Sequence, residues 1–249
     1  MATTRPVSYL ICALPRSGSS VVCDALSATE LAGHPREYFQ PEAVLKWRET
    51  LDLPTGSSPQ DYLLALRREK STPNGVFGAK IMRSHFDAWL SGLNGGGIPA
   101  SPQAASEQLA DLLPGLCFVW MRRRDLVRQG ISLLRATQTD LWHTRNSGRQ
   151  AKMQPHYDFK ELDAKVRLLQ RQDDEWRVFF AEAGLSPTEI VYEEFDADMA
   201  GCIGRTLEAL GIEVPAGMEL FRRPLALNRQ GDALNDEWAT RYHEEQLAH

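Results

Sequence analysis

Residues 9–26 read Tyr9-Leu-Ile-Cys-Ala-Leu-Pro-Arg-Ser-Gly-Ser-Ser-Val-Val-Cys-Asp-Ala-Leu26, and this stretch decides the fold. Its first part, Tyr9 to Leu14, is an unbroken apolar run, as in a strand that is buried on both faces. Pro15 ends the run, and a turn of small polar residues follows. The apolar positions after this turn recur at helical spacing: Val21, Val22, Ala25 and Leu26. The order of strand, small-residue loop and helix predicts an anion site, because a helix N-terminus offers unpaired N–H groups and a partial positive charge.

The loop lacks the lysine of the phosphate-binding loops that hold ATP or GTP, whose pattern is G-x-x-x-x-G-K-[ST]. When the second glycine of the pattern is placed on Gly18, Ala13 falls on the first glycine and Ser19 on the lysine. A cation is present instead at Arg16, on the strand side of the loop. This difference argues against ATP or GTP chemistry. An ordinary strand-to-helix turn closed by Gly18 is the alternative.

The composition restricts the class of protein. A chain of 249 residues with 43% hydrophobic residues suits a single α/β domain over residues 1–249. A net charge of −5 at pH 7 argues against a general nucleic-acid binder. The widely spaced cysteines predict buried thiols in a reducing compartment. The N-terminus does not resemble a signal peptide, and no apolar run approaches the roughly 20 residues of a membrane span. We therefore expect a soluble, cytoplasmic protein.

Three further apolar runs predict the other strands, at residues 76–82, 115–121 and 189–194. Helical patterns separate them, with Ser84 and Asp125 as candidate caps of two of the helices. Strands that alternate with helices predict a parallel sheet flanked by helices. Ligands of such sheets bind beyond the carboxyl ends of the strands. This places four segments near one rim: Arg16–Ser20, Arg83–His85, Arg122–Arg124 and Glu193.

The loop Pro15-Arg-Ser-Gly-Ser-Ser20 resembles the 5′-phosphosulfate loop of sulfotransferases that use 3′-phosphoadenosine-5′-phosphosulfate (PAPS). Arg124 and Ser132, eight residues apart, resemble the Arg-x7-Ser pair that holds the 3′-phosphate in these enzymes. An arginine at a strand end and a serine about two turns along the next helix could clamp one phosphate, by charge and by hydroxyl. The resemblance implies a sulfotransferase fold with a P-loop-like parallel sheet. It also implies PAPS as co-substrate, bound by Arg16, Ser17, Gly18, Ser19, Ser20, Arg124 and Ser132.

The run Gly33-His-Pro-Arg-Glu-Tyr-Phe39 resembles the bacterial sulfotransferases of the trehalose 2-sulfotransferase and nodulation-factor sulfotransferase type. The similarity covers most of the chain and is strongest at residues 9–40 and 118–142. It implies a carbohydrate acceptor, either trehalose or a related sugar or glycolipid. It also implies a homodimer in which both chains shape the acceptor pocket. Arg229 resembles the basic residue of a glycine-ended loop that covers the 3′-phosphate in other sulfotransferases.

Glu37 is the predicted catalytic base, because this bacterial group uses the glutamate of a Pro-x-Glu-[Phe/Tyr]-Phe segment. Sulfuryl transfer needs a base for the acceptor proton and stabilisation of the charge on the leaving phosphate. Arg16 and the loop N–H groups would hold that phosphate. The alternative for Glu37 is a loop carboxylate paired with Arg36 or His34. His85 is a rival base, although its distance from Lys80 departs from the Lys-Thr-x-His pattern of animal and plant sulfotransferases.

Tyr38 could offer a flat face to a sugar, and His85 could contact the substrate. We expect no metal, because a sulfonate carries one charge fewer than a phosphoryl group. In addition, no aspartate ends a strand as the metal-binding aspartate of an ATPase would. Two other functions stay open. One is a P-loop kinase that uses ATP, and the other is a nucleotide-binding regulatory protein without turnover.

Overall fold

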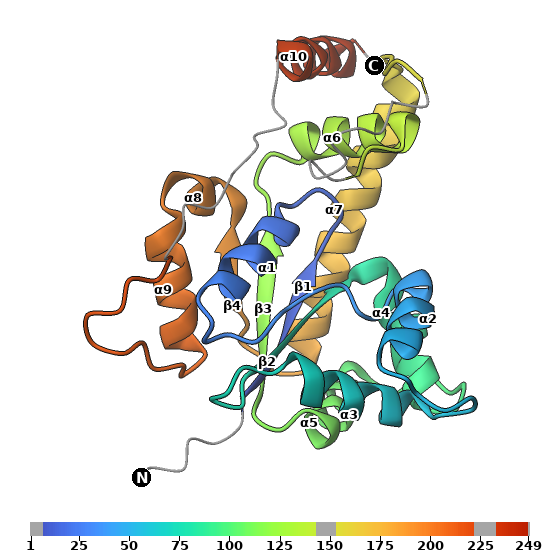
Figure 1. Ribbon diagram of the computed structural model, residues 1–249. Coiled ribbons are helices and arrows are strands. Elements are labelled where there is room, and N and C mark those ends of the chain that lie inside the picture. The colour runs from blue at the N-terminus through green and yellow to red at the C-terminus, as the bar shows by residue number, and fades with distance from the viewer. Residues whose placement is uncertain (1–6, 143–152, 222–232, 249) are drawn as a thin grey trace.

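The computed structural model describes residues 7–142, 153–221 and 233–248. These residues contain a parallel sheet with the strand order β2-β1-β3-β4 (Figure 1). The strands are β1 Ser8–Ala13, β2 Phe77–Met82, β3 Leu116–Arg122 and β4 Thr188–Val191. β1 lies between β2 and β3, and every residue in it is buried, as its unbroken apolar run predicts. The predicted parallel sheet is therefore confirmed.

Helices connect and flank the strands, and several begin where the sequence supplies a cap. Ser58 forms a capping box with Asp61, Ser101 caps the helix after it, and Asp125 caps the next one as predicted. No helix in the described ranges has both the length and the apolar character needed to cross a bilayer. The helices are α1 Ser19–Ala28, α2 Pro41–Thr50, α3 Pro59–Lys70, α4 Arg83–Leu93, α5 Pro102–Leu112, α6 Leu126–Thr139, α7 Phe159–Glu182, α8 Tyr192–Ala197, α9 Met199–Ala209 and α10 Ala233–Leu247.

Two local predictions are wrong. Ser84 does not cap α4, because the helix already begins at Arg83, the residue before it. Met82, which is extended, takes the N-cap position without a side-chain hydrogen bond. The strand predicted at residues 189–194 ends at Val191, and α8 begins at Tyr192. Two carboxylates lie in the first turn of α8, where the partial positive charge of a helix N-terminus favours them.

Helices cover both faces of the sheet and produce three layers (Figure 1). Leu10 and Cys12 of β1 face a core shared with α3, α4, α5 and α7. Tyr9 and Ile11 face the opposite core, which α1, α8 and α9 complete. This alternation follows from the two-residue period of a strand. α6 and α10 lie past the carboxyl end of β3, so these helices border the rim where the predicted site residues gather.

Candidate functional site

The loop between β1 and α1 has the form of an anion site. Arg16 and Gly18 adopt left-handed backbone conformations with φ of 61° and 88°. Gly18 is the N-cap of α1 and has no side chain, so within the described residues no cap side chain accepts from the first N–H groups of the helix. Ser17 is 1% exposed, and its Oγ has no hydrogen-bond partner within the described residues. A buried, unpaired hydroxyl beside an uncapped helix N-terminus suits a bound anion.

Side chains from α6, from α8 and from the segment just after β3 hold the loop in this shape. Arg123 Nη1 donates to the backbone oxygen of Arg16 at 3.3 Å, and Gln129 Nε2 donates to that of Pro15 at 2.7 Å. The ring of Tyr192 lies so close to Gly18 that an added Cβ would be 2.6 Å from its Cδ2 atom. These two loop carbonyls therefore accept hydrogen bonds from side chains, and the N–H groups at the start of α1 are left for a ligand.

Gly18→Ala should lower the free energy of unfolding by more than Gly56→Ala does. The two glycines have nearly the same φ, +88° and +87°, but only Gly18 has a close neighbour, because nothing lies within 4 Å of a Cβ at Gly56. Both substitutions carry the backbone strain of a non-glycine residue there, of order 1–3 kcal/mol. The additional loss of unfolding free energy in Gly18→Ala, relative to Gly56→Ala, measures the contact with Tyr192. Urea denaturation of the two variants tests this, and equal losses would contradict the close packing.

Arg16 is a partly buried cation that has no counter-ion among the described residues. Its Nε donates to Ser132 Oγ at 2.9 Å, and its Nη1 donates to the backbone oxygen of Trp142. Burial lowers the pKa of Arg16, and the neighbouring guanidinium of Arg123 lowers it further. No carboxylate forms an ion pair with Arg16 in the part of the chain that the structure describes. An anion bound in the loop would stabilise this cation.

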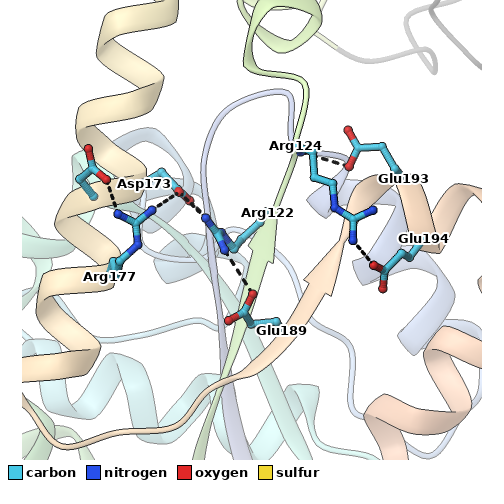
Figure 2. Close-up of polar contacts among 8 residues, drawn as sticks. Arg122, Arg124, Asp173, Arg177, Glu189, Glu193 and Glu194 are labelled. Carbon is cyan, nitrogen blue, oxygen red and sulfur yellow. Dashed lines mark hydrogen bonds and ion pairs between the residues drawn. The ribbon is translucent and has the colours of Figure 1, made fainter.

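The two residues of the predicted 3′-phosphate pair have different neighbours. Ser132 contacts Arg16, as described above, whereas the exposed guanidinium of Arg124 pairs with Glu194 of α8. Figure 2 shows Arg124 turned toward α8, while Arg122 pairs with Asp173 of α7 at 2.9 Å. A phosphate held by both predicted residues would draw Arg124 away from Glu194.

The two candidate bases lie at one place. Glu37 Oε1 is 3.5 Å from His85 Nδ1, and Glu37 Oε2 is 3.2 Å from Lys80 Nζ. The backbone sets this arrangement: the N–H of Lys80 donates to the backbone oxygen of Arg36 at 2.9 Å, and Glu37 forms an isolated parallel bridge with Lys80. The chain after α1 therefore runs along the edge of β2 and brings the carboxylate to its carboxyl end.

The side chains beside Glu37 in the sequence point elsewhere. Arg36 pairs with Asp24 at 3.1 Å, so the alternative pairing of Glu37 with Arg36 is not formed. Tyr38 is 1% exposed, and its hydroxyl donates to the backbone oxygen of His34. Tyr38 therefore belongs to the core, which corrects the expectation that its ring offers a face to a substrate.

Lys80 was missed as a site residue by the sequence analysis. It is 4% exposed, and its Nζ donates to Ser20 Oγ at 3.3 Å as well as contacting Glu37. The ammonium group thus joins the anion loop to the candidate base. A lysine is rarely buried unless it is paired. The signal that could have identified it is a single charge inside an otherwise apolar strand.

The remaining predicted residues are placed as follows. Ser19 opens α1 and is 3% exposed. Arg229 lies in residues 222–232, outside the described part of the chain. Among the residues that the structure describes, no group of three or more His, Cys, Asp or Glu side chains is arranged to hold a metal ion.

A comparison with known protein families decides the classification. The sequence model of the Stf0 sulphotransferase family matches residues 8–245. The chain belongs to this family. Two trehalose 2-sulfotransferases, from Mycobacterium tuberculosis and Mycolicibacterium smegmatis, are each 29% identical to it over 95% of this chain and 94% of their own length. A crystal structure of a sulfotransferase from Alicyclobacillus acidocaldarius has a TM-score of 0.48 and 15% identity, with coverage of 98% of this chain and 94% of that chain.

As a Stf0 sulphotransferase, the chain is an enzyme of the transferase class. The family resemblance read from the Pro15–Ser20 loop is confirmed, and so is the α/β sulfotransferase fold. The cluster at the carboxyl ends of β1 and β2 is its candidate active site. There, Lys80 connects Glu37 to a loop whose cation, Arg16, has no counter-ion and whose Ser17 hydroxyl has no partner in the part of the chain that the structure describes.

Proposed function

We propose that this Stf0 sulphotransferase transfers a sulfuryl group from PAPS to a hydroxyl of a carbohydrate and releases adenosine 3′,5′-bisphosphate. The observation that carries the proposal is the position of Lys80, which is within 3.3 Å of Ser20 in the anion loop and 3.2 Å of Glu37. One buried cation thus lies between an anion site and a candidate base. The relatives named trehalose 2-sulfotransferases make trehalose the first acceptor to test.

The loop fits the phosphosulfate part of the donor. Ser17 supplies a hydroxyl and Arg16 a charge that are both unpaired within the described ranges, and the N-terminus of α1 supplies N–H groups. Arg16 and the N–H groups would hold the 5′-phosphate and stabilise the charge that develops on it as it leaves. Lys80 would act on the opposite side, next to the oxygens of the transferred group.

The proposed transfer forms a bond between the acceptor oxygen and sulfur. The bond from sulfur to the bridging phosphate oxygen breaks, and its electron pair stays on the phosphate. The acceptor proton passes to Glu37, whose side chain is 22% exposed and can therefore be reached by an acceptor. A sugar hydroxyl is much less acidic than a carboxyl group, so the proton leaves late in the transfer. His85 would hold the carboxylate in place from its other oxygen.

Arg124→Ala should weaken the binding of adenosine 3′,5′-bisphosphate, because we propose that Arg124, Ser132 and Arg229 contact its 3′-phosphate. The expected loss is about 1.5–3 kcal/mol, the scale of hydrogen bonds to charged groups. Calorimetry with the bisphosphate and with adenosine 5′-phosphate tests this, since the second ligand lacks the 3′-phosphate and its affinity should not change.

Arg205→Ala is the matched control for Arg124→Ala, because Arg205 is also an exposed arginine paired with one carboxylate, that of Asp198. It should leave the affinity for both ligands unchanged. Such exposed pairs stabilise a protein by at most about 1 kcal/mol. Equal losses for both ligands in Arg124→Ala would show that Arg124 acts on another phosphate or on the fold.

Two measurements test the whole proposal. Calorimetry compares adenosine 3′,5′-bisphosphate with ATP and Mg²⁺, and labelled PAPS is then incubated with trehalose and a panel of other sugars. We expect the bisphosphate to bind and a labelled sugar to form, also in the presence of EDTA. Binding of ATP with no response to the bisphosphate would instead indicate a kinase. Binding of the bisphosphate with no transfer to any hydroxyl would indicate a regulatory protein.

The proposal includes a homodimer and a cytoplasmic location. Cys12, Cys23, Cys117 and Cys202 are unpaired thiols, which supports a reducing compartment. Burial raises the pKa of Cys23 to about 11 and so keeps its thiol protonated. Light scattering tests the assembly, and a mass near the 28.0 kDa of one chain would contradict the homodimer.

A further inference from the structure

A cavity of about 680 Å³ lies between α4, α7 and the start of α5, and no residue of the candidate active site lines it. Its floor is apolar and consists of the buried side chains of Phe86, Leu90 and Phe179. Ile98 and Val178 stand at its mouth as exposed apolar side chains. Cavities of about 300–1,000 Å³ with apolar walls and few polar groups are typical of small-molecule sites.

The cavity and the candidate active site use different faces of α4. Arg83, Phe86, Asp87 and Leu90 line the cavity, and their spacing of three and four residues places them along one face of the helix. His85 projects from the opposite face, toward Glu37. The cavity is therefore a site separate from the cluster at the carboxyl end of β2.

The charged side chains at the edge of the cavity are three arginines and three carboxylates, and one of the arginines has no ion pair among the described residues. Most of them form ion pairs, but no carboxylate pairs with Arg171 in the described ranges, and the Arg171 side chain is exposed on α7. A ligand with one negative charge could pair with the guanidinium of Arg171 there. The pairs are Arg83 with Asp87 at 3.0 Å and with Glu175 at 3.2 Å, Arg167 with Asp163 at 2.7 Å, and Asp174 with Arg177 at 2.5 Å.

We propose that this cavity binds an amphiphile with one hydrocarbon chain and one carboxylate, of the long-chain fatty acid class. The chain lies on Phe86, Leu90 and Phe179, and the carboxylate lies at Arg171. A second copy of this chain fits less well, because Ile98 and Val178 are the exposed large apolar side chains that line the cavity in the described residues. A stable protein interface needs about 800 Å² from each partner.

Calorimetry with dodecanoate, octanoate and dodecanol, each below its micelle concentration, tests the proposal on the full chain. Each buried methylene strengthens binding about four-fold, so dodecanoate should bind at least about ten-fold more tightly than octanoate even if only half of its additional methylenes are buried. Arg171→Glu should weaken dodecanoate binding about ten-fold or more and leave dodecanol unchanged. Val178→Asp should weaken both ligands, because it places a charge in the apolar wall at an exposed position.

Lys165→Glu is the matched control, because it makes the same change of charge on α7 outside the cavity. It should leave the affinity for dodecanoate unchanged. Absence of saturable dodecanoate binding would overturn the proposal, and so would equal losses in Lys165→Glu and Arg171→Glu. A dimer that Val178→Asp converts to monomer, with dodecanoate binding intact, would assign the cavity to a second copy instead. Urea denaturation, measured separately on each variant, shows that the variants are folded and keeps this test independent of the proposed sulfuryl transfer.

Discussion

Glu37→Gln is expected to lower kcat by about 10²–10⁴-fold, the range for loss of a general base. Glutamine keeps the shape of the side chain, but its amide does not accept the acceptor proton. The affinity for adenosine 3′,5′-bisphosphate should stay close to that of the unchanged protein, because a carboxylate adds nothing favourable to the binding of an anionic nucleotide. Steady-state kinetics with labelled PAPS and the acceptor, together with calorimetry, separate these two effects.

His85→Asn is the comparison for Glu37→Gln. The two side chains touch, with His85 Nδ1 3.5 Å from Glu37 Oε1, so kinetics rather than distance must assign the base. We expect a smaller loss in His85→Asn, because it removes a contact to the carboxylate and not the carboxylate itself. A nearly active Glu37→Gln beside an inactive His85→Asn would make His85 the base. Activity in both variants would indicate a base elsewhere.

Lys80→Met is expected to lower kcat by about 10²–10³-fold, the loss observed when one preorganised donor to developing charge is removed. The ammonium group of Lys80 lies between Ser20 and Glu37, where the transferred group would lie in the proposed reaction. Methionine preserves the apolar stem of this buried side chain, so packing changes little. Lys70→Met is the control, because Lys70 is a partly buried lysine of α3 that lies over the Trp47 ring, and its loss should leave kcat unchanged.

A double-mutant cycle distinguishes two roles for Lys80. If it only orients Glu37, Lys80→Met should have little further effect once Glu37 is glutamine. If it stabilises charge on the transferred group, the second substitution should lower kcat again. We expect the second outcome, because Lys80 also contacts the anion loop through Ser20. If Lys80→Met does not lower kcat further in the Glu37→Gln protein, the role of Lys80 is limited to positioning the carboxylate.

The elements that local sequence determines were predicted well. β1, its loop and α1 are consecutive in the chain, and an apolar run, a small-residue turn and helical spacing were sufficient to predict them. Asp125 as a cap is of the same kind, because its side chain accepts from an N–H three residues away. The prediction of a strand at residues 189–194 is wrong at its C-terminal end. The turn from Val191 into α8 has no side-chain cap, so the sequence carries no local signal for the start of that helix.

The features that depend on distant partners were not predicted. Pairing of β1 with both β2 and β3 joins residues far apart in the chain, and no local pattern encodes that order. Lys80 beside Glu37, and Tyr192 against Gly18, result from it. Glu37 as a site residue came from the family resemblance and the chemistry, whereas its partners became visible only in the folded chain. Its role as the base is a prediction that the kinetics above test.

β2 is an outer strand of the sheet, and such strands can pair with a second molecule through their free backbone groups. The segment that carries Glu37 covers part of this edge, because the backbone oxygen of Arg36 accepts a hydrogen bond from the N–H of Lys80. Gly33 fits against the same strand, since a Cβ there would be 2.9 Å from the backbone nitrogen of Gly78. The residues that deliver the carboxylate therefore also shield the sheet from intermolecular pairing. Substitutions that loosen this segment should raise the tendency to aggregate at the same time as they lower turnover.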